Sequence, residues 1–266
     1  KAFLVAHVIN FIFYFGAALK CSDYRFKIPN LKKIELFSFS LKTHLPTVLT
    51  EAEYRIDIFI LLYFINAAAV GIYSIGVTIS QLVWYISNSV NTVLYPYIAS
   101  SGSVEAKSIT AKALRLNLFI NLIAILGLIF FGYYLIIFLF GAEFEKSYLI
   151  FLILTPGLLI DSFSRNITSW LKGIGKPEII SKIVLFSLVL NIILNILLIP
   201  YFGITGAAIS SSLTYITKAF FMIKVFLNKS DFSLNDIFLP KKNEVAELIT
   251  SLKEITIENF KKIKIR

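Results

Sequence analysis

The chain of 266 residues has very few of the side chains that carry most protein chemistry. It contains one cysteine, Cys21, one methionine and two histidines, His7 and His44. A single cysteine excludes an internal disulfide and any zinc site built from cysteines, and the histidines have no partner at metal-ligand spacing. The sequence also has no glycine-rich phosphate loop and no Ser-His-Asp or Cys-His set. We therefore predict no catalytic residue, no metal site and no cofactor, and expect that the protein is not an enzyme.

Charged residues are also scarce, at 16%, whereas 57% of the residues are hydrophobic and the mean hydropathy is +0.79. These values are too apolar for a soluble domain of this size. Most of the apolar segments are long enough to cross a hydrocarbon core of about 30 Å, which takes about 20 residues. We predict an all-α, polytopic membrane protein with about seven transmembrane helices. The segments lie at 2–19, 45–66, 70–99, 113–140, 148–170, 179–199 and 204–227.

Basic residues fall in every second loop between these segments, as the positive-inside rule predicts for cytoplasmic loops. The N-terminus should then lie outside and the C-terminus in the cytoplasm. The net charge of +10 is explained by these flanks and by contact with anionic lipids, so it requires no nucleic-acid partner. The ranges expected in the cytoplasm are 20–44, 100–112, 171–178 and 228–266. The ranges expected on the other side are 67–70, 141–147 and 200–203.

The two ends of the chain differ from the apolar middle. The chain begins with Lys1 and enters an apolar segment almost at once, without the features of a signal peptide. We expect it to be a fragment of a longer protein. After Asn228 the composition changes, and Asp231–Pro240 reads as a linker. Apolar residues then recur at helical spacing among Lys and Glu, which predicts an amphipathic helix that lies on the membrane or in solvent.

The second apolar segment, 45–66, carries four charges. Glu51 and Arg55 are four residues apart in the order that favours an ion pair within a helix. Glu53 and Asp57 form a second stripe. Because a charge inside a span is expensive, we interpret this patch as facing an aqueous cavity, with Arg55 as the main contact for an anion and a carboxylate as the site for a cation or proton. The alternative is a helix whose cytoplasmic half lies outside the lipid, with paired or snorkelling charges.

The fifth segment, 148–170, repeats this pattern with Asp161 and Arg165. We expect either a structural ion pair that holds the helices together or a second patch facing the cavity. Amides recur in other segments, among them Asn88 and Asn91. Hydrogen bonds between helices are the common use of such amides, and a path for sugars is the alternative.

Several stretches together resemble a known family. They are 88–101, Leu171–Pro177, Asn191–Asn195 and Leu198–Ala208. In their order and spacing, these stretches resemble bacterial polysaccharide flippases of the O-antigen type, in the multidrug/oligosaccharidyl-lipid/polysaccharide exporter superfamily. The resemblance covers about residues 1–228.

The resemblance implies twelve spans in two six-helix lobes around a central cavity that opens alternately to either side. On that map residues 1–19 are the last helix of the N-terminal lobe and 20–44 are the cytoplasmic link between the lobes. Residues 45–228 are the C-terminal six-helix lobe and 229–266 are a cytoplasmic tail. The N-terminal lobe would be a missing partner. The implied task is to flip polyprenyl-diphosphate-linked oligosaccharides across the bacterial inner membrane, for lipopolysaccharide or capsule.

The resemblance also implies roles for the polar residues. The carboxylates would bind a coupling ion, and the choice between a proton and a sodium ion is left open. The alternatives are an ion-coupled drug or cation antiporter of the same superfamily, a membrane polysaccharide polymerase or glycosyltransferase, and a seven-helix receptor. The candidates for substrate binding are Arg55, Asn88, Asn91 and Arg165. The candidates for ion coupling are Glu51, Glu53, Asp57 and Asp161.

Overall fold

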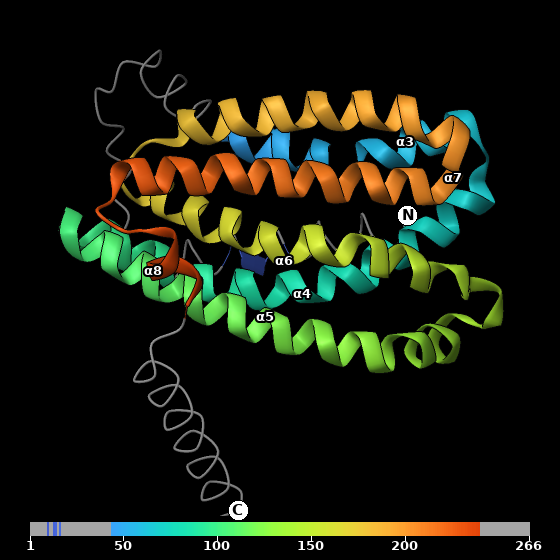
Figure 1. The fold of residues 1–266 in the computed structure, drawn as a ribbon, viewed down its shortest axis with the longest axis horizontal. Helices are drawn as coiled ribbons and strands as arrows, with labels where there is room; N and C mark the ends of the chain where they lie inside the picture. The colour runs from blue at the N-terminus through green and yellow to red at the C-terminus, as the bar shows by residue number, and fades with distance from the viewer. Residues whose placement is uncertain (1–9, 11–12, 15, 17–43, 240–266) are drawn as a thin grey trace, which may run out of the picture. The chain divides into compact units, whose positions relative to one another are not determined.

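The computed structural model describes residues 10, 13, 14, 16 and 44–239. The chain divides into two units, 1–40 and 41–266, and the fold below is that of the second unit (Figure 1). Of the predicted helix at 2–19, the four described residues are helical. Most of the predicted link at 20–44 and the predicted amphipathic helix beyond residue 240 lie outside the described residues.

The described part of the second unit is built from helices, with no strand among its residues. Residues 44–53 are helical. Four helices are long and apolar enough to cross a membrane, which together with the absence of strands confirms the predicted all-α, membrane-spanning class. The helices after residue 53 are α3 (Ile56–Phe64), α4 (Ala67–Ser100), α5 (Ser103–Phe140), the short 3-10 helix η1 (Ala142–Phe144), α6 (Lys146–Gly173), α7 (Pro177–Lys229) and α8 (Leu234–Phe238).

The helix α7 passes along the bundle twice. Its 53 residues would extend about 80 Å if straight, more than twice the hydrocarbon thickness. The reversal occurs at Gly203, whose φ of 60° and ψ of −135° favour glycine, and Figure 1 shows the two halves running side by side. A Cβ at Gly206 would lie 2.5 Å from the Leu198 carbonyl oxygen. The two predicted spans at 179–199 and 204–227 are therefore present, joined by a turn of one residue.

The predicted continuous helix at 45–66 is wrong in one respect. The helix is broken at Tyr54–Arg55, where the chain forms a turn before α3 begins. Asp57 lies in the first turn of α3, and its Oδ1 accepts the Ile58 backbone N–H at 2.8 Å. A carboxylate is favoured at that position by the unpaired amides of a helix N-terminus. The break thus separates Glu53 from Asp57 and lets each carboxylate take different partners.

Two of the predicted loops are also shorter than expected. Residues 67–70 belong to α4, which begins at Ala67. The side chain of Asn66, just before it, accepts the Ala69 backbone N–H at 2.9 Å. Residues 103–112 belong to α5. Asn66 supplies a cap of the ordinary kind, so the helix can start immediately after the turn. The charged residues of the predicted loop at 100–112 lie mostly on an extension of a membrane helix.

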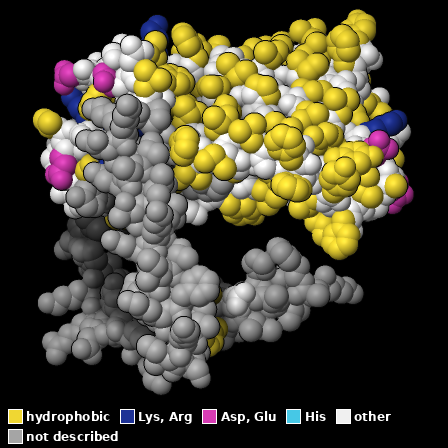
Figure 2. Space-filling model, turned by 60° about the horizontal axis from the view of Figure 1, so that its bottom comes forward, with side chains coloured by type: hydrophobic (Ala, Val, Ile, Leu, Met, Phe, Trp, Pro, Cys, Tyr) yellow, Lys and Arg dark blue, Asp and Glu magenta, His cyan; other side chains and the backbone are white. Residues whose placement is uncertain are grey.

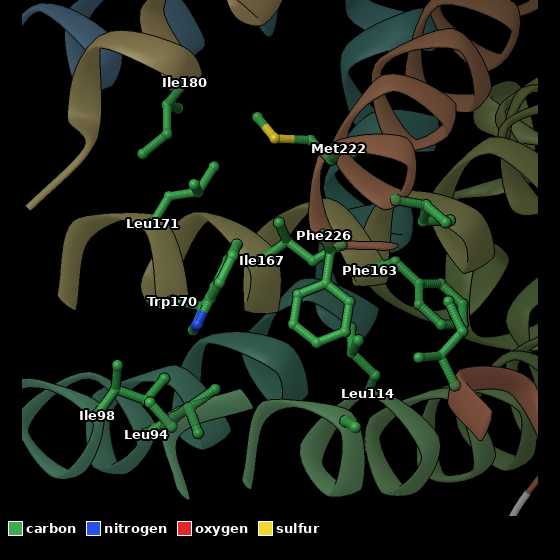
Figure 3. Packing of buried hydrophobic residues seen from close by; sticks show 14 of the residues in the cluster. Leu94, Ile98, Leu114, Phe163, Ile167, Trp170, Leu171, Ile180, Met222 and Phe226 are labelled. Carbon is green, nitrogen blue, oxygen red and sulfur yellow. The ribbon is translucent and has the colours of Figure 1, made fainter. Parts of the chain in front are cut away.

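The centre of the bundle is α6, which packs against α4, α5 and α7. At one end, Trp170 and Ile167 of α6 lie among Leu94 and Ile98 of α4 and Phe226 of α7 (Figure 3). The rings of Trp170 and Phe226 meet edge to face with centroids 5.0 Å apart. Figure 2 shows many hydrophobic side chains and no charged ones over the middle of one outer face, while charged side chains gather toward its ends. This surface suits contact with lipid.

The segment predicted as a linker, Asp231–Pro240, is packed against the bundle over its described part. We call residues 230–239 the C-terminal strap. Its short helix α8 begins with a capping box between Ser233 and Asp236, and Ile237 is fully buried. Phe238 packs on Phe163 of α6, with ring centroids 4.7 Å apart. The linker prediction is wrong because three apolar residues among polar neighbours, Phe232, Ile237 and Phe238, join the core.

The crossing of α6 and α7 depends on Gly157. A Cβ there would lie 2.7 Å from the Ser212 Cα and 2.8 Å from its carbonyl oxygen, so Gly157→Ala must push two backbones apart. We expect a loss of roughly 1–3 kcal/mol in unfolding free energy, measured as a lower thermal unfolding midpoint in detergent. Gly127→Ala is the control, since nothing lies within 4 Å of that position. Equal midpoints for the two variants would contradict the close crossing.

Candidate functional site

Four charged side chains meet inside the bundle, and the ammonium group of Lys218 lies at their centre. The Lys218 Nζ is 2.9 Å from the Glu53 Oε2 and 3.1 Å from the Asp161 Oδ1. The Arg165 Nε is 3.4 Å from the Asp161 Oδ2. These residues come from the helix 44–53, α6 and the second half of α7. We call them the buried charge network.

The buried charge network balances two positive charges with two negative charges. The side chains of Glu53 and Asp161 are fully buried, and those of Lys218 and Arg165 are 3% and 13% exposed. Isolated charges would be very costly in such a place, so pairing is required. The Ser187 hydroxyl donates to the Glu53 Oε1 at 2.5 Å and occupies a further acceptor position. The network therefore ties three segments of the bundle without a net charge.

Arg165 is held by more than its ion pair. Its Nη2 donates to the Tyr54 hydroxyl at 2.9 Å, and its Nη1 donates to the Asn88 Oδ1 at 3.2 Å. The guanidinium carbon lies 4.0 Å from the centroid of the Trp84 ring, a distance at which a cation is attracted to the ring. Tyr54 packs on Trp84 with centroids 4.4 Å apart. Contacts with α4, α6 and the broken helix thus set the position of the guanidinium.

Two polar cavities share Arg165, Tyr54, Asn88 and Glu51 in their walls. The first, which we call the α6 recess, has a volume of about 340 Å³. The second, the α4 recess, has a volume of about 350 Å³. The α6 recess is also lined by Asn91, Ser164, Thr168, Ser169 and Lys172, and the α4 recess by Arg55, Ser74, Thr78, Gln81 and Trp84.

Asp57 lies in a separate polar cluster that involves no described cation. Its Oδ2 accepts hydrogen bonds from the Tyr73 hydroxyl and, at 3.2 Å, from the Ser211 hydroxyl. Behind them, the Asn191 Nδ2 is 3.4 Å from the Ser211 Oγ, and the Asn195 Nδ2 donates to the Asn191 Oδ1 at 2.8 Å. Asp57 and both asparagines are almost completely buried. This cluster offers several oxygen atoms around one carboxylate.

The predicted site residues therefore fall into three groups. Glu53, Asp161, Arg165 and Asn88 come together around the buried charge network. Asn91 lines the α6 recess beside them. The predicted pair of Glu51 and Arg55 is present at 3.7 Å between Nε and Oε2, but the two side chains are 62% and 69% exposed at the rim of the cavities. Asp57 forms the third group, in the separate polar cluster with Tyr73 and Ser211.

Sequence reasoning missed the central role of Lys218 and the contributions of Tyr54, Trp84 and Ser187. Lys218 lies in the predicted span at 204–227. The available signal was that Lys218 is a charged residue inside an apolar span, while Glu53 and Asp57 had no assigned cation. Distance in sequence hid the pairing, since Lys218 and Glu53 are 165 residues apart. Among the described residues, no three His, Cys, Asp or Glu side chains gather in a possible metal site.

Residues 1–149 match the family model described as "Polysaccharide biosynthesis protein". The chain belongs to this family. An uncharacterised membrane protein of Methanocaldococcus jannaschii is 28% identical over 235 residues, which cover 85% of this chain and 55% of that relative. A probable low-salt glycan biosynthesis flippase of Haloferax volcanii, Agl15, is 24% identical over 163 residues, 60% of this chain and 34% of that relative.

The fold is also similar to that of solved transporters. An outward-facing multidrug resistance transporter of the MATE family, in the MOP superfamily, superposes with a TM-score of 0.59 at 18% identity, covering 78% of this chain and 48% of the transporter. The predicted resemblance to polysaccharide flippases of this superfamily is confirmed. The chain spans between about a third and just over half of the length of the curated relatives named above.

The buried charge network leads to a test by compensation. Lys218→Met should leave two buried carboxylates with one cation and lower stability by roughly 3–5 kcal/mol. Lys218→Met combined with Glu53→Gln keeps the Asp161–Arg165 pair and should recover part of that loss. The measurement is thermal unfolding of each purified variant, with the single Glu53→Gln as control. A double variant that is less stable than Lys218→Met alone would count against the network.

Proposed function

We propose that this chain forms the second lobe of a transporter that flips polyprenyl-diphosphate-linked oligosaccharides across the cytoplasmic membrane, for surface polysaccharide of the O-antigen or capsule type. The observation that carries the proposal is the position of Arg165 in the common wall of two polar recesses, inside a bundle of membrane-length helices. A guanidinium presents paired N–H donors in a plane, which suits the oxygens of a diphosphate. We assign Arg165 the main contact with that anion.

The task explains why such a bundle needs polar cavities. A glycan cannot enter hydrocarbon, because its hydroxyls would lose water without gaining other hydrogen bonds. A cavity between two lobes allows the glycan to pass while the lipid tail stays in the bilayer. Alternating access then requires only that two packed lobes rock against one another. No covalent step is needed, and the name of the glycan biosynthesis flippase among the relatives supports this reading.

Arg55 takes a secondary role in this proposal. It was the main anion contact expected from the sequence. Both guanidinium groups have a carboxylate partner, but the Arg55 side chain is 69% exposed, whereas that of Arg165 is 13% exposed and reaches both recesses. A desolvated guanidinium interacts more strongly with an anion than one in water. We place Arg55 at the rim, where it can meet an approaching anion.

The test is export of surface glycan in the strain that carries the complete gene. Arg165→Gln should abolish glycan display while the protein still reaches the membrane, and Arg165→Lys should restore part of it. Arg55→Ala should have a smaller effect. Normal display by Arg165→Gln would remove the basis for the proposal. If resistance to cationic drugs changed while glycan display did not, the drug antiporter, favoured by the MATE-like fold, would be supported instead.

We further propose that Asp57 is the site of ion coupling, for a proton or sodium ion. The support is its burial among neutral oxygen-bearing partners without a described cation. Asp57→Asn keeps the size of the side chain and removes its charge. We expect it to weaken the dependence of transport on an ion gradient, measured in reconstituted vesicles with and without a sodium or proton gradient. Unchanged dependence on both gradients would exclude Asp57.

We propose that the end of the bundle that carries Lys172 and Lys176 faces the cytoplasm, with the C-terminus inside. The support is the excess of basic residues at that end. In a Cys21→Ser background, Glu143→Cys should react with an impermeant thiol reagent added to intact cells, and Lys176→Cys should react only after the cells are opened. Both positions are exposed on the described surface. The reverse pattern would invert the orientation.

A further inference from the structure

A polar stripe runs along α6 from the buried charge network to the end of the helix. Its members recur at the three- and four-residue steps that place side chains on one face of a helix. Arg165 and Lys172 are seven residues apart, a rise of about 10.5 Å, and neutral hydroxyls lie between them. The stripe consists of Asp161, Ser164, Arg165, Thr168, Ser169 and Lys172, and all six line the α6 recess.

The hydroxyls of this stripe have unused hydrogen-bonding capacity. Elsewhere in the bundle, threonines donate to the carbonyl four residues earlier, as Thr78 does to Ser74 and Thr214 to Ser210, at 2.8 and 2.7 Å. The side-chain hydroxyl of Thr168, inside α6, makes no such hydrogen bond to a described residue. Ser164 is 3% exposed, and its hydroxyl has no partner within the described part of the chain. Unsatisfied polar groups are costly within a membrane, so this arrangement indicates that something else fills the recess.

The part of the recess wall formed by α4 adds a hydrogen-bond acceptor that also lacks a partner among the described residues. Asn91 of α4 lines the α6 recess, and its Oδ1 is buried without a partner among the described residues. The acidic groups in the wall are already used, since Asp161 is paired within the network and Glu51 with Arg55. Lys172 stands at the end of the stripe and pairs with no described carboxylate. The free groups are therefore mostly neutral donors and acceptors.

This set of groups fits a polyhydroxyl ligand better than a second phosphate. Hydroxyls and an amide can donate and accept in turn, as a sugar ring requires, and the ammonium of Lys172 adds donors. The volume of about 340 Å³ lies at the low end of the range for small-ligand pockets. Trp84 lines the α4 recess and not the α6 recess, and the one aromatic ring among the described residues that line the α6 recess, that of Tyr54, already packs against Trp84 and Tyr215. Recognition in this region must therefore rest on hydrogen bonds.

We propose that the α6 recess is a sugar subsite, in which Ser164, Thr168 and Asn91 bind the sugar attached directly to the diphosphate. This inference rests on the proposed function, which places the diphosphate at Arg165. It adds that the chain distinguishes lipid-linked glycans by their first sugar. Binding at this recess then separates recognition of the sugar from recognition of the charge.

The test compares two lipids with the protein as its gene encodes it, purified in detergent. One is the lipid-linked oligosaccharide extracted from the source cells. The other is the sugar-free polyprenyl diphosphate left after acid release of the glycan from the same extract. The variant Ser164→Ala/Thr168→Val should weaken binding of the glycan-bearing lipid about tenfold, as expected for the loss of two ordinary hydrogen bonds. It should leave the affinity for the sugar-free lipid unchanged.

The matched control makes the same kind of change outside both cavities. Ser89 and Thr92 of α4 line neither recess, and their hydroxyls donate to backbone carbonyls four residues earlier, so Ser89→Ala/Thr92→Val should bind both lipids like the unmodified protein. Thr168→Ser retains a hydroxyl and should retain the preference for the sugar. An equal loss for both lipids, no loss for either, or an equal loss in the control pair would overturn the subsite.

A failure of the proposed function looks different in the same assay. Arg165→Gln should weaken binding of both lipids more than tenfold, since hydrogen bonds to a charged group are the stronger kind. If Arg165→Gln left the affinity for the sugar-free lipid unchanged, the diphosphate would not lie at Arg165, while the sugar preference of the recess could still be read from the stripe variant. Unmodified protein that bound neither lipid would overturn both proposals.

Discussion

The contact between Lys218 and its two carboxylates is the interaction on which the rest of this lobe depends. A lysine in an apolar span is tolerated only when opposite charges surround it, and here Glu53 and Asp161 do so from two other segments. Because Asp161 also pairs with Arg165, the position of one guanidinium is linked to the position of one ammonium. The site is therefore as rigid as the junction of α6, α7 and the broken helix.

The break at Tyr54–Arg55 follows from the same constraint. Glu53 has to reach Lys218 and Ser187, while Asp57 has to reach Tyr73 and Ser211. A regular helix would place the two carboxylates on nearly one stripe, one turn apart. Because of the turn, the helix 44–53 contributes Glu53 to the buried charge network, and α3 contributes Asp57 to a separate polar cluster. The turn also brings Tyr54 between Trp84 and the network, where its hydroxyl accepts from Arg165.

Much of the fold could be predicted from the sequence because lipid imposes simple rules. Hydropathy located the spans, and the loop at 200–203 contained Gly203, where the chain reverses. The Asp161–Arg165 pair followed from local spacing. The partners of Lys218 did not, because periodicity within one helix says nothing about which faces of distant helices meet. The packing of Ile237 and Phe238 against the core could not be predicted either, because a helix of five residues gives no periodic signal.

The C-terminal strap has a consequence for the way the lobe is made. Ile237 fills a place among side chains from earlier helices, and Arg115 donates to the Asp236 carbonyl. During synthesis these earlier helices leave the ribosome well before residue 237 does, so the groove that receives α8 stays uncovered until almost all of the described chain has been made. This late segment covers parts of α5 and α6. A chain stopped at the end of α7 would keep an apolar groove open at that end.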